Sequence, residues 1–199
     1  MTINSEVRYA SSPEDAKRYD TAELRRRYLI ENVFSADEVN MTYTMHDRMI
    51  AGGAMPVGEI LELKPIDILR ADYFLERREM GIFNVGGKGI VTAGDKEYEL
   101  DYKEAIYLGL GSRKVTFRSL DPAKPAKFYF CSANAHATYP DHKTTKENAV
   151  HMELGTLEES NHRVINRMLV KEVVPTCQLQ MGMTELKPGS TWNTMPAHT

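Results

Sequence analysis

The sequence predicts a mainly β protein, an antiparallel sandwich or barrel, and two features lead to that prediction. Between Ala71 and Cys131, short segments that alternate apolar and polar side chains follow one another closely, separated by turn residues. The composition, 42% hydrophobic and 27% charged, is typical of a globular protein with a sizeable core. At 199 residues, the chain is long enough for one large or two small domains.

The start of the chain predicts helices. Ser12 is a suitable N-cap, and Pro13 suits the first position of a short helix. A second helix is expected over about 21–31. Asp20 would be its N-cap, and Glu23 would complete a capping box.

After Val33 the composition changes to strand-forming residues. The stretch VNMTYTMHDRMIAGGAM is rich in β-branched and aromatic residues and predicts a strand that ends in a turn at Gly52-Gly53. The glycines of NVGGKGIVTAG are assigned to tight turns. A phosphate loop needs a helix directly after the glycines, whereas Ile90 and Val91 indicate a strand.

A series of hairpins is expected next. The segment DKEYELDY places Tyr98, Leu100 and Tyr102 on one strand face and acidic residues on the other, and AGD before it predicts a hairpin turn. KVTFRS and KFYFCS predict two further strands. These segments account for most of the expected first β unit.

A second β unit is predicted near the end of the chain. The polar stretch 141–159 has no clear assignment, and NHRVINRMLV fits either a strand or a helical turn. TCQLQMGMTELKPG alternates again and ends in the turn signal Pro188-Gly189. The predicted organisation is a helical segment 1–33, a first β domain with its connecting segment 34–174, and the start of a second β unit, 175–199.

Charge and cysteine content restrict the partners. A net charge of −3 and a pI near 6.1 argue against nucleic acid or an anionic membrane as a partner. The sequence has neither a secretory signal nor an apolar run long enough to span a membrane, which predicts a cytoplasmic protein. Cys131 and Cys177 are widely separated and are expected to be reduced and packed.

Two kinds of residue offer chemistry. The stretch YFLERREMG has two interpretations, a charged strand face with neighbouring ion pairs or an arginine that recognises an anion, and we favour the first. The six histidines are scattered, without the spacing that aims two rings at one metal. His198 is the exception, because it follows a Pro-Gly turn at the expected start of a strand, where a His-x-His pair would need position 200.

Four segments carry a family resemblance: VFSADEVNMTYTMHDRMIAGGAMP, YFLERREMGIFNVGGKG, PAKFYFCSANAHATYP and TCQLQMGMTELKPGSTWNTMPAHT. Together they resemble the 5-keto-4-deoxyuronate isomerases (4-deoxy-L-threo-5-hexosulose-uronate ketol-isomerases), bicupin enzymes of pectin and uronate breakdown. The resemblance implies a double cupin, an RmlC-like jelly roll. The first barrel would be complete and lack metal-binding histidines, and the second would be cut after its first strands.

The resemblance also implies a metal. In that family one divalent ion, usually zinc, is held by three histidines and a glutamate. Only the first ligand, His198, is carried over to this sequence. The other ligands would come after Thr199, so we expect a C-terminally truncated chain that is inactive alone.

The implied reaction interconverts 5-dehydro-4-deoxy-D-glucuronate and 3-deoxy-D-glycero-2,5-hexodiulosonate by a metal-assisted proton transfer of the aldose–ketose type. The implied enzyme is an intramolecular oxidoreductase and a homohexamer that acts on a small uronate. Its general base is not identified, and Arg163 and Arg167 are considered for the substrate carboxylate but not assigned. Two alternatives stay open: a related 5-deoxy-glucuronate isomerase of inositol breakdown, and a non-enzymatic sugar-binding cupin.

Overall fold

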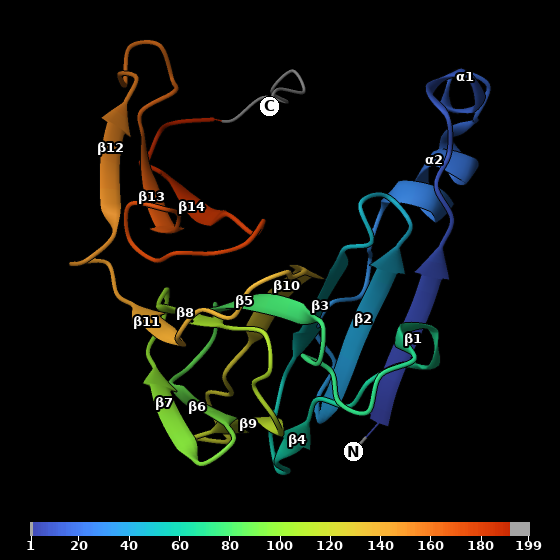
Figure 1. Ribbon diagram of the computed structural model, residues 1–199. Coiled ribbons are helices and arrows are strands. Elements are labelled where there is room, and N and C mark those ends of the chain that lie inside the picture. The colour runs from blue at the N-terminus through green and yellow to red at the C-terminus, as the bar shows by residue number, and fades with distance from the viewer. Residues whose placement is uncertain (1, 192–199) are drawn as a thin grey trace.

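The computed structural model describes residues 2–191 (Figure 1). The prediction of a mainly β protein is confirmed, because three β-sheets account for most of the regular structure. The largest sheet contains, in spatial order, β1 (Thr2–Arg8), β2 (Glu38–Thr44), β3 (Ile50–Ala54), β10 (Phe128–Asn134), β5 (Arg78–Asn84), β8 (Ala105–Leu108) and β11 (His142–Thr144).

A four-stranded sheet packs against this one. Its strands, in spatial order, are β4 (Leu61–Glu62), β9 (Val115–Ser119), β6 (Gly89–Ala93) and β7 (Lys96–Leu100). Apolar side chains from both sheets form one core. At its centre the ring of Phe117 lies 5.4 Å from that of Phe128 and 6.3 Å from that of Phe130, measured between centroids. The hairpin turn predicted by AGD is confirmed, since Ala93 pairs with Lys96 across Gly94, whose φ is +65°.

Strand β5 is buried along its whole length. Its even-numbered residues Met80 and Ile82 face the core between the two sheets. Its other face is covered by a second apolar cluster that includes Leu169 and Met181. The approach is so close that a Cβ at Gly81 would lie 2.4 Å from the sulfur of Met181. The centre of the large sheet is therefore packed on both faces, by the main core on one and by the second apolar cluster on the other.

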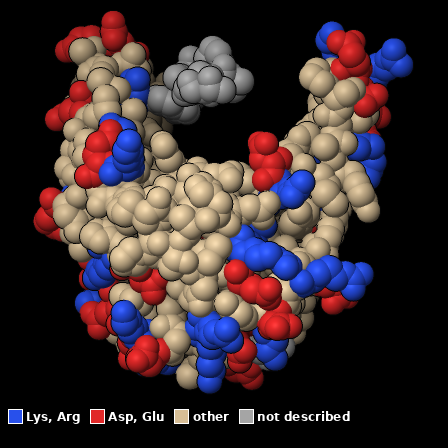
Figure 2. Space-filling view, viewed as in Figure 1, with Lys and Arg blue, Asp and Glu red and all other residues tan. Residues whose placement is uncertain are grey.

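The second apolar cluster lies between the large sheet and a small sheet near the end of the described chain. The strands are β12 (Val150–Leu154), β13 (Arg163–Leu169) and β14 (Met181–Leu186), paired antiparallel in that order. The stretch NHRVINRMLV, which fitted a strand or a helical turn, contains strand β13. This sheet rises on one side of the molecule and the N-terminal arm on the other, and a broad area without charged residues lies between them (Figures 1 and 2).

The N-terminal arm combines a strand with helices. The expected helices are present as α1 (Pro13–Ala16) and α2 (Thr21–Tyr28), and α2 ends three residues before its predicted end. The arm begins, however, with β1, which pairs in parallel with β2 and was not predicted. Neither helix is long and apolar enough to cross a membrane, and the same is true of every described helix.

Two local predictions need correction. Asp20 caps α2 through the N–H of Glu23, but the Glu23 carboxylate binds Arg26 and Arg27 and forms no capping box. Gly52 lies inside β3 and not in a turn. A Cβ there would lie 2.3 Å from the carbonyl oxygen of Asn40 and 2.7 Å from the Phe130 ring, so close packing explains the glycine.

A third correction concerns the end of a strand. The alternation predicted for DKEYELDY holds for Tyr98 and Leu100 on β7. Tyr102 is exposed instead, because the strand ends at Leu100 and the chain turns there. Both cysteines are free.

Candidate functional site around β14

The closing segment enters the structure as strand β14 and the turn after it. Its residues alternate between half-buried and exposed, as predicted for TCQLQMGMTELKPG. The turn predicted by Pro188-Gly189 is confirmed, since Gly189 has φ +84° and the N–H of Ser190 donates to the carbonyl of Lys187 over 3.0 Å. The predicted metal ligand His198 lies outside the described residues.

The described residues do not fit a zinc site. Between residues 2 and 191, no group of three or more histidine, cysteine, aspartate or glutamate side chains lies close enough to hold a metal. His151 Nδ1 is 2.7 Å from Asn166 Oδ1, and His162 Nε2 is 2.7 Å from Glu153 Oε1. Because structural and catalytic zinc sites need three or four such ligands, no catalytic step through zinc can be assigned to this part of the chain.

A buried carboxylate holds the segment that leads into β14. Glu79 is fully buried on β5, on the face opposite Met80. Its Oε1 accepts the backbone N–H groups of Gln178 and Leu179 over 2.7 Å each, and its Oε2 accepts that of Cys177 over 2.8 Å. The hydroxyl of Tyr107 donates a fourth hydrogen bond. Four donors satisfy a buried anion without an opposite charge.

A second carboxylate, near the end of β14, ties this strand to earlier parts of the chain. Glu185 binds the ammonium groups of Lys103 and of Lys146, the latter over 2.8 Å. Asn166 on β13 donates to Glu185 Oε1 over 2.9 Å. The hydrogen bonds from the two lysines hold the pKa of Glu185 at about 2. The buried carboxylate of Glu79 and the half-buried carboxylate of Glu185 thus join the small sheet to the rest of the described chain.

The arginines considered for a substrate carboxylate lie on β13. Arg167 forms an ion pair with Glu172 over 2.8 Å, and Arg163 donates to the carbonyl of Asn161 over 2.8 Å. Neither arginine lines any of the cavities described below. They remain unassigned.

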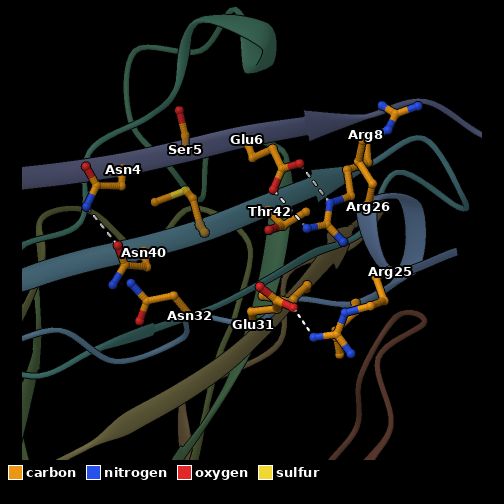
Figure 3. Close-up of a pocket in the computed structure, with 13 residues that line it drawn as sticks. Asn4, Ser5, Glu6, Arg8, Arg25, Arg26, Glu31, Asn32, Asn40 and Thr42 are labelled. Carbon is orange, nitrogen blue, oxygen red and sulfur yellow. Dashed lines mark hydrogen bonds and ion pairs between the residues drawn. The ribbon is translucent and has the colours of Figure 1, made fainter. Parts of the chain in front are cut away.

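A polar cavity lies elsewhere, between strands β1 and β2 and helix α2. It has a volume of about 540 Å³ and is polar (Figure 3). Its charged groups are already paired, because Arg8 binds Glu6 over 2.9 Å and Arg25 binds Glu31. Asn4 also bonds Asn40 over 2.8 Å. Among its described lining residues, every arginine and glutamate forms an ion pair and none is a histidine or cysteine, so no chemistry is assigned to it.

The interpretation of YFLERREMG as a charged strand face with neighbouring ion pairs is wrong for its central residues. Only Arg77 and Glu76 match it, at 3.6 Å. Arg78 and Glu79 are buried and point to opposite faces of β5, because successive side chains of a strand alternate. The sequence did contain a signal, because the charged pair Arg78-Glu79 stands directly before the apolar run Met80–Phe83. Charged residues that begin a buried strand must find their hydrogen-bond partners inside the protein.

Comparisons with known proteins agree with one another. The KduI/IolB family model matches residues 28–199. The 4-deoxy-L-threo-5-hexosulose-uronate ketol-isomerase of Bacteroides fragilis is 68% identical over 198 residues, which cover 100% of this chain and 71% of the relative. The 4-deoxy-L-threo-5-hexosulose-uronate ketol-isomerase 1 of Bacteroides thetaiotaomicron is 66% identical with the same coverage.

A solved structure shows only a weak likeness. An IolB-like protein from Salmonella typhimurium is 15% identical, with a match that covers 64% of this chain and 47% of that one. The TM-score is 0.48.

Proposed function

The chain belongs to the KduI/IolB family, and we propose that it acts as a ketol-isomerase on 5-dehydro-4-deoxy-D-glucuronate. The observation that carries the proposal is 68% identity over the full chain to a ketol-isomerase that acts on this class of sugar acid. The product is 3-deoxy-D-glycero-2,5-hexodiulosonate, so the enzyme is an intramolecular oxidoreductase.

The reaction moves a carbonyl group by one carbon. A base removes the proton from the hydroxyl-bearing carbon beside the carbonyl, and a proton is returned to the former carbonyl carbon. The enediolate between these steps is costly in water and needs electrostatic stabilisation. The base, the substrate-binding residues and the stabilising group are not assigned to described residues. Glu79 and Glu185 hold β14 and its entry in place, and His198 follows this strand in the sequence.

The proposal includes zinc, with His198 as its first ligand. Its support is the resemblance of the closing segment, which ends in His198 and Thr199. Histidine and carboxylate donors suit this ion. By the same reasoning, the 199-residue chain alone is expected to be inactive.

The proposed architecture is a double cupin. Strands of the two larger sheets would form the first barrel, and β12–β14 would begin the second. The pairing of β13 with β14 supports a second unit that recruits strands from the connecting segment and not only from 175–199. The predicted division at 33/34 and 174/175 stays a prediction.

The proposed assembly is a homo-oligomer, a hexamer by family resemblance. The N-terminal arm supports an oligomer, because α1 and α2 bury no residue within the chain. Leu24 and Tyr28, one turn apart on α2, are 40% and 46% exposed. A cytoplasmic location, with neither nucleic acid nor membrane as partner, also stays a proposal. Light scattering on the purified protein would measure the assembly, and a monomer would contradict it.

The test of the proposed function is an activity assay with two substrates. A chimera would join this chain to the part of the Bacteroides fragilis relative that the chain does not match. With zinc supplied, the chimera is expected to convert 5-dehydro-4-deoxy-D-glucuronate and to leave 5-deoxy-D-glucuronate unchanged. Conversion of 5-deoxy-D-glucuronate alone would favour the inositol-pathway alternative. Inactivity on both sugars by a chimera whose cooperative melting shows that it is folded would favour a binding protein.

A further inference from the structure

A second cavity, of about 410 Å³, opens at one end of the main core. It lies where the turn between β2 and β3 meets the start of β5 and the end of β10. Three arginines line it, Arg48, Arg77 and Arg78, and no aspartate or glutamate is among its described lining residues. The cavity therefore has a positive wall, and Glu76, which pairs with Arg77 over 3.6 Å, is not among its described lining residues.

Arg78 gives this wall a fixed and buried charge. Its side chain lies on the same face of β5 as Met80, at the end of the core, and the residue is 3% exposed. Its guanidinium donates to Ser132 Oγ over 3.0 Å, to Asn134 Oδ1 over 2.8 Å, and to the carbonyls of Arg48 and Ser132 over 2.8 and 2.7 Å. All four acceptors are neutral.

Among the described residues, no carboxylate forms an ion pair with the Arg78 guanidinium. A guanidinium has five N–H groups, and four of them are engaged here, which leaves one on Nη1. Burial lowers the pKa of Arg78 to about 10, as expected for a charge held away from water without a carboxylate beside it. A bound anion would supply the missing opposite charge.

The side chains of the other two arginines differ in their hydrogen-bond partners. Arg77 is held by the carbonyls of Leu69 and Arg70 over 2.7 Å each. The Arg48 side chain makes no hydrogen bond or ion pair with any described residue, although its carbonyl accepts from Arg78. Asp47 and Arg48 have φ of 54° and 53°, as the two central residues of a type I′ hairpin turn between β2 and β3, in which the N–H of Met49 donates to the carbonyl of His46 over 3.4 Å.

The rest of the wall is apolar. Ile68, Leu69 and Phe74 line the cavity beside the arginines. The volume lies within the range of small-molecule sites, which combine apolar walls with a few placed polar groups. The ligand that fits has an anionic head and a body with an apolar face.

We propose that this cavity binds a small organic carboxylate, held by Arg48 and Arg78 at its head group and by Leu69 and Phe74 along its body. A carboxylate matches the planar donor arrangement of a guanidinium, and charge-assisted bonds of this kind are strong. The proposal stands on the cavity alone and does not depend on the proposed isomerase activity.

The experiment is isothermal titration calorimetry on the 199-residue chain at low ionic strength. The probes are D-galacturonate, D-galactose as its uncharged counterpart, and inorganic phosphate. We expect saturable binding of D-galacturonate, none of D-galactose, and weaker binding of phosphate. Arg48→Met should weaken D-galacturonate binding by about tenfold or more, because it removes a charge-assisted contact.

Arg18→Met is the matched control, since Arg18 is exposed, carries the same charge and lies outside this cavity. It should leave the affinity unchanged. Arg48→Met should melt like the parent chain, because the side chain it removes has no partner among the described residues. The proposal is overturned by any of three results: no saturable binding of D-galacturonate, equal weakening in Arg48→Met and Arg18→Met, or phosphate binding tighter than D-galacturonate.

Discussion

The hydroxyl of Tyr107 donates a hydrogen bond to the carboxylate of Glu79 in the protein interior, with 2.7 Å between Oη and Oε2. Burial, followed by this bond, raises the pKa of Tyr107, so the hydroxyl stays a donor over the whole neutral range. The same carboxylate collects three backbone N–H groups from residues 177–179. One anion thus links β5, β8 and the entry to β14.

Glu79→Gln should loosen the entry to β14. An amide turns its NH₂ toward backbone donors and leaves some of them unpaired, which predicts a loss of about 3 kcal/mol in the free energy of unfolding. Hydrogen–deuterium exchange should show faster exchange at the amides of Cys177, Gln178 and Leu179. Glu97→Gln, at an exposed ion pair, is the control and should change stability little. Unchanged exchange at 177–179 in Glu79→Gln would refute the role of this carboxylate.

Glu185 makes stability depend on acid pH. Its folded-state pKa, about 2, lies below the ordinary 4.5, so its contribution is complete above pH 4.5 and is lost as the pH falls toward 2. Glu185→Gln should therefore lower stability at pH 7 by about 1 kcal/mol, a modest value because the pair is partly exposed. Below pH 2 the variant and the parent should become equal.

Urea unfolding at several pH values measures this difference. Glu99→Gln is the comparison, because the ion pair of Glu99 with Lys88 is about half exposed on both sides and should contribute less. A difference between Glu185→Gln and the parent that does not shrink between pH 4.5 and 2 would contradict the account.

Gly52→Ala should be strongly destabilising, by about 2 kcal/mol or more. The added methyl group would meet the Asn40 carbonyl at 2.3 Å and the Phe130 ring at 2.7 Å, and both lie in the packed interior. Gly58→Ala offers a matched control, since its nearest neighbour would be Asp37 Oδ2 at 3.7 Å. Thermal melting of both variants compares them. Equal melting temperatures would mean that Gly52 is not a packing requirement.

The purified 199-residue chain should contain far less than one zinc ion per chain. His198 alone cannot hold the ion, and residues 2–191 have no group of three donors to assist it. Plasma mass spectrometry after dialysis without chelator measures the content. A value near one ion per chain would contradict this expectation.

Local signals in the sequence predicted local structure well. Ser12 and Pro13 placed α1, and Gly94 placed a hairpin, because each acts on its immediate neighbours. The parallel pairing of β1 with β2 was missed, since it joins Thr2 to Glu38 and most of β1 is exposed. Distant pairing of a strand without an apolar face has no pattern to recognise.

The site was harder to predict than the fold. The role of Glu79 depends on amides about 100 positions away, at Gln178 and Leu179. The arginine cavity depends on Arg48 and Arg78, which meet only because the β2–β3 turn folds against the start of β5. The sequence shows that these residues are charged. Only their tertiary neighbours show that the carboxylate of Glu79 is fully hydrogen-bonded and that the guanidinium of Arg78 has no described carboxylate beside it.

The most direct test of the isomerase assignment follows the sugar in D₂O by NMR, with the folded chimera and zinc. Proton transfer through an enediolate predicts that the aldehyde signal disappears and that a hydroxymethyl group containing deuterium forms at the same carbon. Recovery of the unchanged aldehyde after prolonged incubation would contradict the assignment.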